Sequence, residues 1–300
     1  MLARITQEFG DEHTRKKLET VEKYLGAYAT ALKYSPFKLL YVDACAGSGS
    51  SVPKGTLEQP SPNQVSLEGF STPIADTDAI IVGSARRALG VNPPFHKYLL
   101  NDTKKSNVDA LRKSIRDDYP HLSDRVELTR LDVNEMLRKL CASQNWNETR
   151  AVVFLDPFGL QINYETLELL GKTKAVDVWY LVPVFAMYRQ ISGGGQINPD
   201  GGPRVDAALG TTVWRDVAVV EERSMDLFDQ PQFKSSRAVD IAWFEKVAKE
   251  RIGAAFGGRV LDETLPLGRN GIQEFSLMFA WANPKEKAKL AAKLAKAVLA

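Results

Sequence analysis

Four short apolar segments of this chain each end in an aspartate, and this pattern constrains the possible folds more than any other feature. The four acids are Asp43, Asp102, Asp132 and Asp156. Between them lie segments with apolar residues at three- and four-residue spacing, so strands and helices are predicted to alternate. Such alternation indicates a mostly parallel, doubly wound α/β sheet of the Rossmann-like type, in which the carboxyl ends of the strands face one crevice.

The same periodicity places the elements and divides the chain. Strands are predicted at residues 37–42, 96–100, 126–131, 151–155, 175–182 and 274–281. Helices are predicted at residues 13–32, 80–89, 106–119, 134–142 and 164–170, with a lysine-rich helix after Pro284. We assign residues 1–185 and 263–300 to the α/β core and residues 186–262 to a mostly helical insertion or lid. The stretch 50–78 is rich in Ser, Pro and Gly, and we predict an active-site loop or an insertion there.

Composition narrows the class of protein. The chain has 300 residues, of which 44% are hydrophobic and 25% charged, as is usual for a soluble globular protein. It has no apolar run of the roughly 18 residues that indicates a membrane-spanning helix, and its N-terminal segment lacks a signal-peptide core. Two cysteines cannot form a disulfide framework, so we expect a cytoplasmic protein without a membrane partner. The net charge of +2 does not by itself indicate nucleic-acid binding.

The first strand ends in a turn of small residues. Cys45, Ala46, Gly47 and Gly49 follow Asp43 closely. Because glycine carries no β-carbon, backbone N–H groups in such a turn can approach a ligand. Asp43 is placed to hold the amino group of an amino-acid moiety, directly or through water. Cys45 is interpreted as a small hydrophobic residue of the turn.

The next two strand ends carry acids suited to a nucleoside. Asp102 can accept hydrogen bonds from both hydroxyls of a ribose, the role of the acid after the second strand in dinucleotide folds. Asp132 can accept the exocyclic amine of an adenine, beside the apolar wall of Val133. An amino-acid moiety, a ribose and an adenine together predict S-adenosylmethionine (SAM) as the cofactor. The alternative for Asp102 or Asp132 taken singly is a helix N-cap.

The fourth strand end has the groups that a methyl acceptor would need. Asp156 precedes Pro157, and proline favours an extended conformation of the residue before it. The carboxylate and a neighbouring carbonyl can then bind the hydrogens of one amino group and direct its lone pair towards an electrophilic methyl group. Phe158 offers a ring on which a planar base could stack. The alternative is an ordinary Asp-Pro turn that ends a buried strand.

Other chemistries have less support in the sequence. A dinucleotide site of the Gly-x-Gly-x-x-Gly type would not place an acid directly before the turn, so an NAD-dependent oxidoreductase is a weaker alternative. A cytosine-C5 transferase needs a nucleophilic thiolate after the fourth strand, whereas Cys141 lies in a predicted helix. The three histidines are scattered, no metal-ligand spacing is present, and no phosphate-binding loop of the Gly-Lys type occurs. We therefore predict no metal site.

Four segments carry a family resemblance: residues 13–25, the turn at 41–49, Gly83-Ser84, and the tetrapeptide at 156–159. Together they resemble class I SAM-dependent methyltransferases, and specifically the three-Cys-motif partner (TcmP) proteins. The resemblance implies a fold of the class I methyltransferase type. It also implies a bacterial mobile or defence gene set and a partner protein with a three-cysteine motif.

The resemblance also implies roles for individual residues. Asp43, Gly47 and Gly49 match the loop that holds the methionine part of SAM, Asp102 matches the ribose acid, and Asp132 the adenine acid. Residues 156–158 match imperfectly the Asp-Pro-Pro-Tyr motif of enzymes that methylate amino groups of DNA and RNA. The second proline is missing here and the aromatic residue comes one place early.

Two groups of lysines are candidate anion-binding residues. Lys285, Lys289, Lys293 and Lys296 lie at three- and four-residue steps in the last predicted helix, where they could contact a phosphate backbone or form a solvated helix face. Lys16 and Lys17 precede the first strand and could reach the cofactor carboxylate or face solvent.

These observations predict a SAM-dependent methyltransferase whose acceptor is an amino group on a DNA or RNA base. In this prediction Asp156, Pro157 and Phe158 serve the acceptor. The cofactor is bound by Asp43, Cys45, Ala46, Gly47, Gly49, Asp102, Asp132 and Val133. The alternative is a methyltransferase-like binding module that acts with a three-cysteine-motif protein and has no turnover.

Overall fold

The computed structural model describes residues 2–51, 81–225 and 231–300. Its main sheet has seven strands in the order β10-β11-β7-β6-β1-β4-β5. The strands are β1 (Lys38–Asp43), β4 (Lys97–Asn101), β5 (Val126–Thr129), β6 (Thr149–Leu155), β7 (Val176–Val182), β10 (Leu265–Arg269) and β11 (Ile272–Trp281). The five strands from β7 to β5 pair in parallel, whereas β11 is antiparallel to both β7 and β10. The predicted doubly wound α/β sheet is confirmed.

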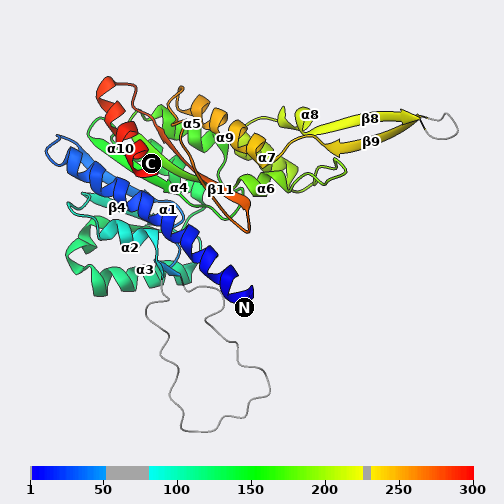
Figure 1. The fold of residues 1–300 in the computed structure, drawn as a ribbon. Helices are drawn as coiled ribbons and strands as arrows, with labels where there is room; N and C mark the ends of the chain where they lie inside the picture. Colours follow the sequence, from blue (N-terminus) through cyan, green and yellow to red (C-terminus); the bar gives the residue numbers. More distant parts are fainter. Residues whose placement is uncertain (1, 52–80, 226–230) are drawn as a thin grey trace, which may run out of the picture.

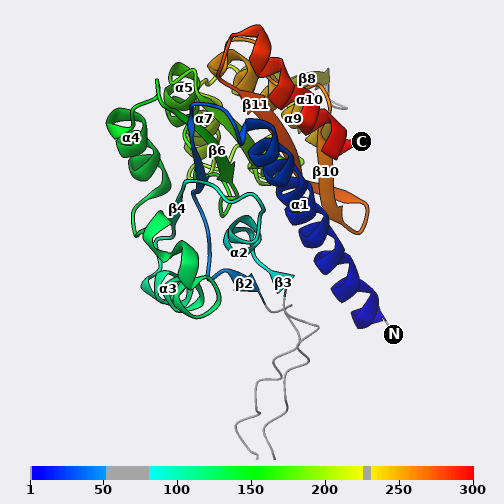
Figure 2. The same cartoon turned by 90° about the vertical axis from the view of Figure 1, so that its left-hand side faces the viewer.

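Helices cover both faces of this sheet (Figures 1 and 2). They are α1 (Leu2–Leu32), α2 (Ser84–Leu89), α3 (Lys105–Asp118), α4 (Val133–Ser143), α5 (Tyr164–Lys172), α6 (Val184–Tyr188), α7 (Gly202–Leu209), α8 (Trp214–Ala218), α9 (Ile241–Ala255) and α10 (Lys289–Leu299). Short 3₁₀ helices cover Pro120–Arg125 and Glu286–Ala288, and β2 (Ser50–Ser51) pairs with β3 (Ile81–Val82).

Alternation along the central strands creates the two layers of the core. In β1, Leu39 and Tyr41 point to the side of α1, α2, α3 and α10. Leu40 and Val42 point to the opposite side, where α4, α5 and α9 contribute buried residues. Both faces of β1 are therefore apolar, as expected for a strand in a parallel sheet covered on both sides. Burying a large apolar side chain of this kind stabilises the fold by about 1.5–3 kcal/mol.

The N-terminal helix is fixed against the sheet by aromatic packing and one buried hydrogen bond. The ring of Tyr24 lies 5.4 Å from that of Trp179 and 5.1 Å from that of Phe279, centroid to centroid. Its hydroxyl donates to Asp177 Oδ2 at 3.0 Å. The helix predicted from residue 13 begins at Leu2, and its central part is held in one orientation over β7 and β11.

The strand order reverses next to β1, which pairs with β4 on one side and with β6 on the other. In open α/β sheets, ligands bind in the crevice outside the carboxyl ends of the strands at such a switch point. Asp43 ends β1, and Asp156 follows β6 directly. Two of the four strand-end acids therefore flank the switch point.

The segment at 186–262, predicted to be mostly helical, also contains strands. β8 (Val219–Met225) and β9 (Pro231–Arg237) form an antiparallel hairpin that extends away from the sheet (Figure 1). The apolar-polar alternation of a half-buried strand is absent from this part of the sequence, so the hairpin was not predicted. Within the same segment, Phe244, Ile252 and Phe256 of α9 are buried in the core beneath the sheet. The boundary between core and insertion remains a prediction.

Other parts of the sequence prediction have different outcomes. Most of the predicted loop at 50–78 lies outside the described residues. The edge strand β10 was missed, because its sequence Leu-Pro-Leu-Gly-Arg contains both a proline and a glycine. In the lysine-rich closing helix, Lys289 pairs with Glu286 and Lys296 pairs with Glu263. Among the described helices, none is long and apolar enough to cross a bilayer.

Candidate functional site

Two adjoining pockets lie at the carboxyl ends of the strands. The larger, with a volume of about 380 Å³, is lined by the turn after β1, by Ser84, by the loop after β6 and by one face of α1; we call it the turn pocket. The smaller, of about 280 Å³, is lined by Asp102, Asp132 and their neighbours; we call it the side pocket. Cys45 and Phe158 line both pockets, so the two spaces meet at these residues.

The turn after β1 provides one wall of the turn pocket. Cys45, Ala46, Gly47 and Gly49 all line it, as does Ser48 between them. Gly47 and Gly49 have φ of +60° and +79°, a region that favours glycine. A β-carbon on Gly47 would meet no protein atom within 4 Å, so the space beside this residue is open. The predicted close approach of a ligand to this backbone is therefore sterically possible.

The start of α2 completes this wall. The N–H of Gly83 donates to Gly49 O at 2.9 Å, which joins the two segments backbone to backbone. A β-carbon on Gly83 would lie 2.9 Å from Gly49 C, closer than real side chains allow. Gly83 is therefore needed where it stands, and it brings Ser84 to the pocket. This is the physical basis of the Gly-Ser pair in the sequence pattern.

Asp43 lies beneath the turn pocket and is not one of its lining residues. Its side chain is fully buried and accepts hydrogen bonds from the Cys45 N–H at 3.4 Å and the Tyr41 hydroxyl at 3.3 Å. Ser84, which does line the pocket, also bonds to it. Burial raises the pKa of Asp43 to about 7, and the charge of Asp156 adds to the rise. Asp43 therefore supports the pocket from below, and its hydrogen bond with Ser84 connects it to the pocket lining.

Asp102 faces the side pocket while it holds two backbone groups. Its Oδ2 accepts from the Gly47 N–H at 3.1 Å and its Oδ1 from the Lys104 N–H at 2.7 Å. The first bond ties the end of β4 to the turn after β1. A carboxylate has about four acceptor positions, so each oxygen retains capacity for a ligand hydroxyl. The predicted ribose-binding role therefore remains compatible with the geometry.

Asp132 is the N-cap of α4. Its Oδ1 accepts from the N–H groups of Asn134 and Glu135 at 2.9 and 3.2 Å. The N-cap alternative that the sequence left open for this residue is thus realised. Asp132 is nevertheless exposed and lines the side pocket beside the buried Val133. Both capping bonds end on Oδ1, so the predicted adenine contact is compatible with the cap.

Asn101 holds the three loops around the side pocket together. This buried amide donates to Ala44 O and Leu131 O, both at 3.1 Å. Its carbonyl accepts from Thr129 Oγ1 at 2.9 Å and from the Leu131 N–H at 3.1 Å. The ends of β1, β4 and β5 are therefore connected through one side chain. Asn101 directly follows the strand predicted at residues 96–100, and nothing in the local sequence pattern indicates which loops its side chain reaches.

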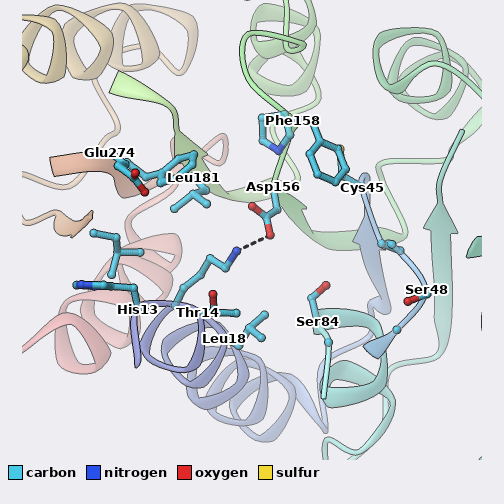
Figure 3. A pocket seen from close by; sticks show the side chains of 18 of the residues that line it. His13, Thr14, Leu18, Cys45, Ser48, Ser84, Asp156, Phe158, Leu181 and Glu274 are labelled. Atoms are coloured by element: carbon cyan, nitrogen blue, oxygen red, sulfur yellow. Dashed lines mark hydrogen bonds and ion pairs between the residues drawn. The ribbon is translucent and has the colours of Figure 1, made fainter. Parts of the chain in front are cut away.

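Asp156 lines the turn pocket and forms an ion pair with Lys17 of α1 (Figure 3). Lys17 Nζ lies 2.6 Å from Asp156 Oδ2, and the two side chains are 12% and 26% exposed. The sequence predicts that Lys17 either reaches the cofactor carboxylate or faces solvent. In the structure its ammonium instead faces Asp156, the candidate acceptor acid. The neighbouring Lys16 is exposed and lies outside the pocket lining.

The rest of the loop after β6 divides between the core and solvent. Pro157 is buried, whereas the Phe158 side chain is 76% exposed. The Phe158 N–H donates to Gln161 Oε1 at 2.9 Å, and Lys104 Nζ lies 5.9 Å from the centroid of the Phe158 ring. An exposed aromatic ring beside a cation is suited to stacking with a base.

The described residues contain no cluster of acids, histidines and cysteines that could hold a metal ion. Burial raises the pKa of the Cys45 thiol strongly, and the charges of Asp43, Asp156 and Asp102 raise it further. Burial also raises the pKa of Cys141 to about 11. Both side chains are therefore thiols near neutral pH, which disfavours covalent catalysis by a thiolate.

No family model matches the chain. No curated protein matches its sequence. Among solved structures, protein LPL1258 from Legionella pneumophila, described as a DUF519 protein, is 14% identical over 82% of this chain and 93% of its own, with a TM-score of 0.38. The O-methyltransferase from Bacillus cereus, in complex with SAH, is 12% identical over 73% and 81%, with a TM-score of 0.32. The glycopeptide N-methyltransferase MtfA, complexed with sinefungin, is 12% identical over 85% of both chains, with a TM-score of 0.34. At these values the neighbours assign no ligand, substrate or partner to this chain.

Proposed function

We propose that this protein is a SAM-dependent methyltransferase. The observation that carries the proposal is the pair of adjoining pockets at the switch point of the sheet. One is lined by a small-residue turn and the other by two strand-end acids, and they meet at Cys45 and Phe158. A ligand with an amino-acid end and a nucleoside end matches this arrangement in both shape and polarity.

The side pocket is suited to the nucleoside. Asp102 has remaining acceptor capacity for ribose hydroxyls, and Asp132 for an adenine amine beside Val133. The turn pocket is suited to the methionine part, because the small residues from Cys45 to Gly49 leave space beside the backbone and the Ser84 hydroxyl, bonded to Asp43, lines the pocket. When bound, SAM supplies an electrophilic methyl group attached to a sulfonium.

The proposed acceptor is an amino group on a DNA or RNA base. Asp156 and the Pro157 carbonyl would accept hydrogens of this amino group, and Phe158 would stack on the base with Lys104 nearby. An acceptor that uses Asp156 must share or displace the Lys17 ammonium. No covalent intermediate is needed, so the contribution of these residues is positioning of the nucleophile. The same proposal includes membership of the TcmP family and a bacterial, cytoplasmic setting.

The Lys17–Asp156 ion pair favours one second candidate. If the acceptor subsite is permanently filled by Lys17, the chain is a SAM-binding module that acts with a three-cysteine-motif protein and has no turnover. An NAD-dependent oxidoreductase has less support, because a buried acid lies directly under the turn where a pyrophosphate would bind.

Calorimetry with SAM, its demethylated product S-adenosylhomocysteine and NAD tests the cofactor directly. We expect heat with the first two and none with NAD; absence of binding with SAM would refute the proposal. Transfer of labelled methyl groups to single- and double-stranded DNA and RNA then separates the two candidates. An enzyme labels at least one of these acceptors and loses the labelling in Asp156→Asn, whereas a module binds SAM and labels none.

A further inference from the structure

Lys17 places an amine of the chain itself at the acid that we propose to hold the acceptor. We propose that Lys17 is a self-methylation site, at which the Nζ bound to Asp156 accepts a methyl group from SAM. This inference rests on the proposed function, because it requires SAM in the adjoining pockets. It goes beyond that function by naming a residue of this chain as a substrate.

The position of the amine is the first reason. Lys17 Nζ lies 2.6 Å from Asp156 Oδ2, within hydrogen-bond distance. In the view of Figure 3, Asp156 lies between Ser84 and Cys45 on one side and His13 and Glu274 on the other, and Lys17 itself is one of the residues that line the turn pocket. The ammonium is therefore inside the pocket that is proposed to receive the methyl group, and not on the outer surface.

The burial of the pair distinguishes it from ordinary surface ion pairs. The Lys17 side chain is 12% exposed, the lowest value for any cation in an ion pair within the described part of the chain. By comparison, Lys105 in its pair with Asp109 is 75% exposed. A lysine that served only as a solvated surface residue of α1 would remain more exposed to water than Lys17 is.

The backbone that carries Lys17 is fixed. Leu18 and Val21 on the same helix are buried in the core, and Tyr24 is bonded to Asp177. Glu22, one turn further along, accepts a bond from Arg87 Nη1 at 2.5 Å. The amine is consequently presented from a rigid helix, and pre-positioned reactants react faster than free ones.

The transfer balances without any further reagent. The Lys17 ammonium loses one proton to the Asp156 carboxylate, and the freed lone pair forms a bond to the methyl carbon of SAM. The bond between that carbon and sulfur breaks, and S-adenosylhomocysteine leaves with the electron pair. Each methyl group replaces one N–H and retains the positive charge on protonation. One or two transfers leave an N–H to donate to Asp156, so mono- and dimethyl-lysine are the expected products.

The test uses the full chain with isotope-labelled SAM and peptide mass spectrometry. We expect methyl groups on Lys17, either already present after purification or added during incubation, and none on Lys16. Lys17→Arg keeps a cation beside Asp156 but should lose the modification at this position. Lys16→Arg, a change at the exposed neighbour, should leave it unaltered. Asp156→Asn should slow labelling by about 100-fold, because the proton acceptor is lost.

Two further measurements separate the possible outcomes. Labelling within one molecule keeps the same half-time when the protein is diluted about tenfold, whereas slower labelling on dilution would mean transfer between molecules and overturn the proposal. Acetylation of Lys17 by acetic anhydride, with no methyl donor present, should fall when S-adenosylhomocysteine saturates the site, while Lys16 is unaffected. If a nucleic-acid acceptor is labelled but Lys17 carries no methyl group, self-methylation is refuted and the proposed function stands. If SAM binds and neither is labelled, self-methylation and methyl transfer are both refuted. If SAM does not bind, both are refuted.

Discussion

The two loops that flank the switch point both begin with an aspartate, but the two carboxylates lie in opposite surroundings. Asp43, in the turn after β1, is fully buried and is surrounded by the neutral donors Tyr41, Ser84 and the Cys45 N–H. Asp156, after β6, is about a quarter exposed, lines the turn pocket and faces the cation Lys17. One acid supports the pocket from below, while the other presents its charge inside the pocket.

This difference shows that a strand-end acid does not acquire its role from its place in the sheet alone. A buried carboxylate without a cation is costly to ionise, so Asp43 is suited to organising hydroxyl and N–H groups. A carboxylate paired with an ammonium remains available for exchange with another amine. The comparison therefore predicts that changes in the first loop affect cofactor binding, and changes in the second affect transfer.

The largest expected effect comes from variants that separate methyl transfer from cofactor binding. Asp156→Ala should lower methyl transfer about 10²- to 10⁴-fold, because the group that positions the amine and accepts its proton is lost. Its SAM affinity, measured by calorimetry, should change less than about threefold. Asp102→Ala should lower SAM affinity by about tenfold or more, through loss of charge-assisted hydrogen bonds. If Asp156→Ala lost SAM binding and Asp102→Ala did not, the assignment of the two pockets would be wrong.

The next effect concerns the pH dependence of stability. The pKa of Asp43 is raised to about 7 in the folded protein by burial, above the value near 3.9 of an unfolded chain. The contribution of this carboxyl to stability is therefore complete below about pH 4 and is lost as the pH rises to about 7. Asp43→Asn should remove this loss of stability. The free energy of unfolding of the variant, compared with that of wild type, should therefore rise by up to about 4 kcal/mol between about pH 4 and pH 7.

Asp177→Asn is the matched control for this measurement. Burial also raises the pKa of Asp177 to about 7, but this residue lies away from both pockets, beneath α1. Both variants should show the same direction of pH dependence in urea denaturation at pH 4 to 8. Only Asp43→Asn should alter SAM affinity. Equal SAM affinity in Asp43→Asn, Asp43→Ala and wild type would contradict the supporting role of Asp43.

A smaller effect tests how tightly each loop is packed. Gly83→Ala introduces a β-carbon 2.9 Å from the Gly49 backbone and should destabilise the protein by about 2–3 kcal/mol. Gly159→Ala, in the second loop, meets no atom within 4 Å and should cost only about 1 kcal/mol, because φ is +69°. Thermal denaturation measures both. A larger loss for Gly159→Ala would reverse the comparison of a packed first loop with an open second loop.

The smallest effect on stability is expected at Phe158. Because this side chain is 76% exposed, Phe158→Ala should change the free energy of unfolding by less than about 0.5 kcal/mol. Its free energy of binding to single-stranded oligonucleotides, measured by fluorescence anisotropy, should become less favourable by about 1–3 kcal/mol if a base stacks on the ring. Phe158→Tyr, which retains an aromatic face, should bind like wild type. Unchanged affinity in Phe158→Ala would argue against a base as the acceptor.

Much of the architecture could be predicted because it depends on local periodicity. The alternation of apolar strands and amphipathic helices indicated the doubly wound sheet, and the acids marked the carboxyl ends of the strands. Cys45 to Gly49 line one pocket, and Asp102, Asp132 and Val133 line the other, as their strand-end positions suggested. The strands β8, β9 and β10 were missed, because the hairpin of β8 and β9 lacks alternation and β10 contains proline and glycine.

The sequence by itself determined which residues meet at the carboxyl edge of the sheet, because strand ends in a parallel sheet face the same side whatever the details of packing. Only the tertiary structure decided what each of those residues touches. Asp43 lies below the pocket floor because β1 is covered on both faces. Lys17 reaches Asp156 from 139 positions away because the aromatic core under α1 fixes how that helix crosses the sheet. Contacts of that kind depend on how whole elements dock, and no local pattern in the sequence records them.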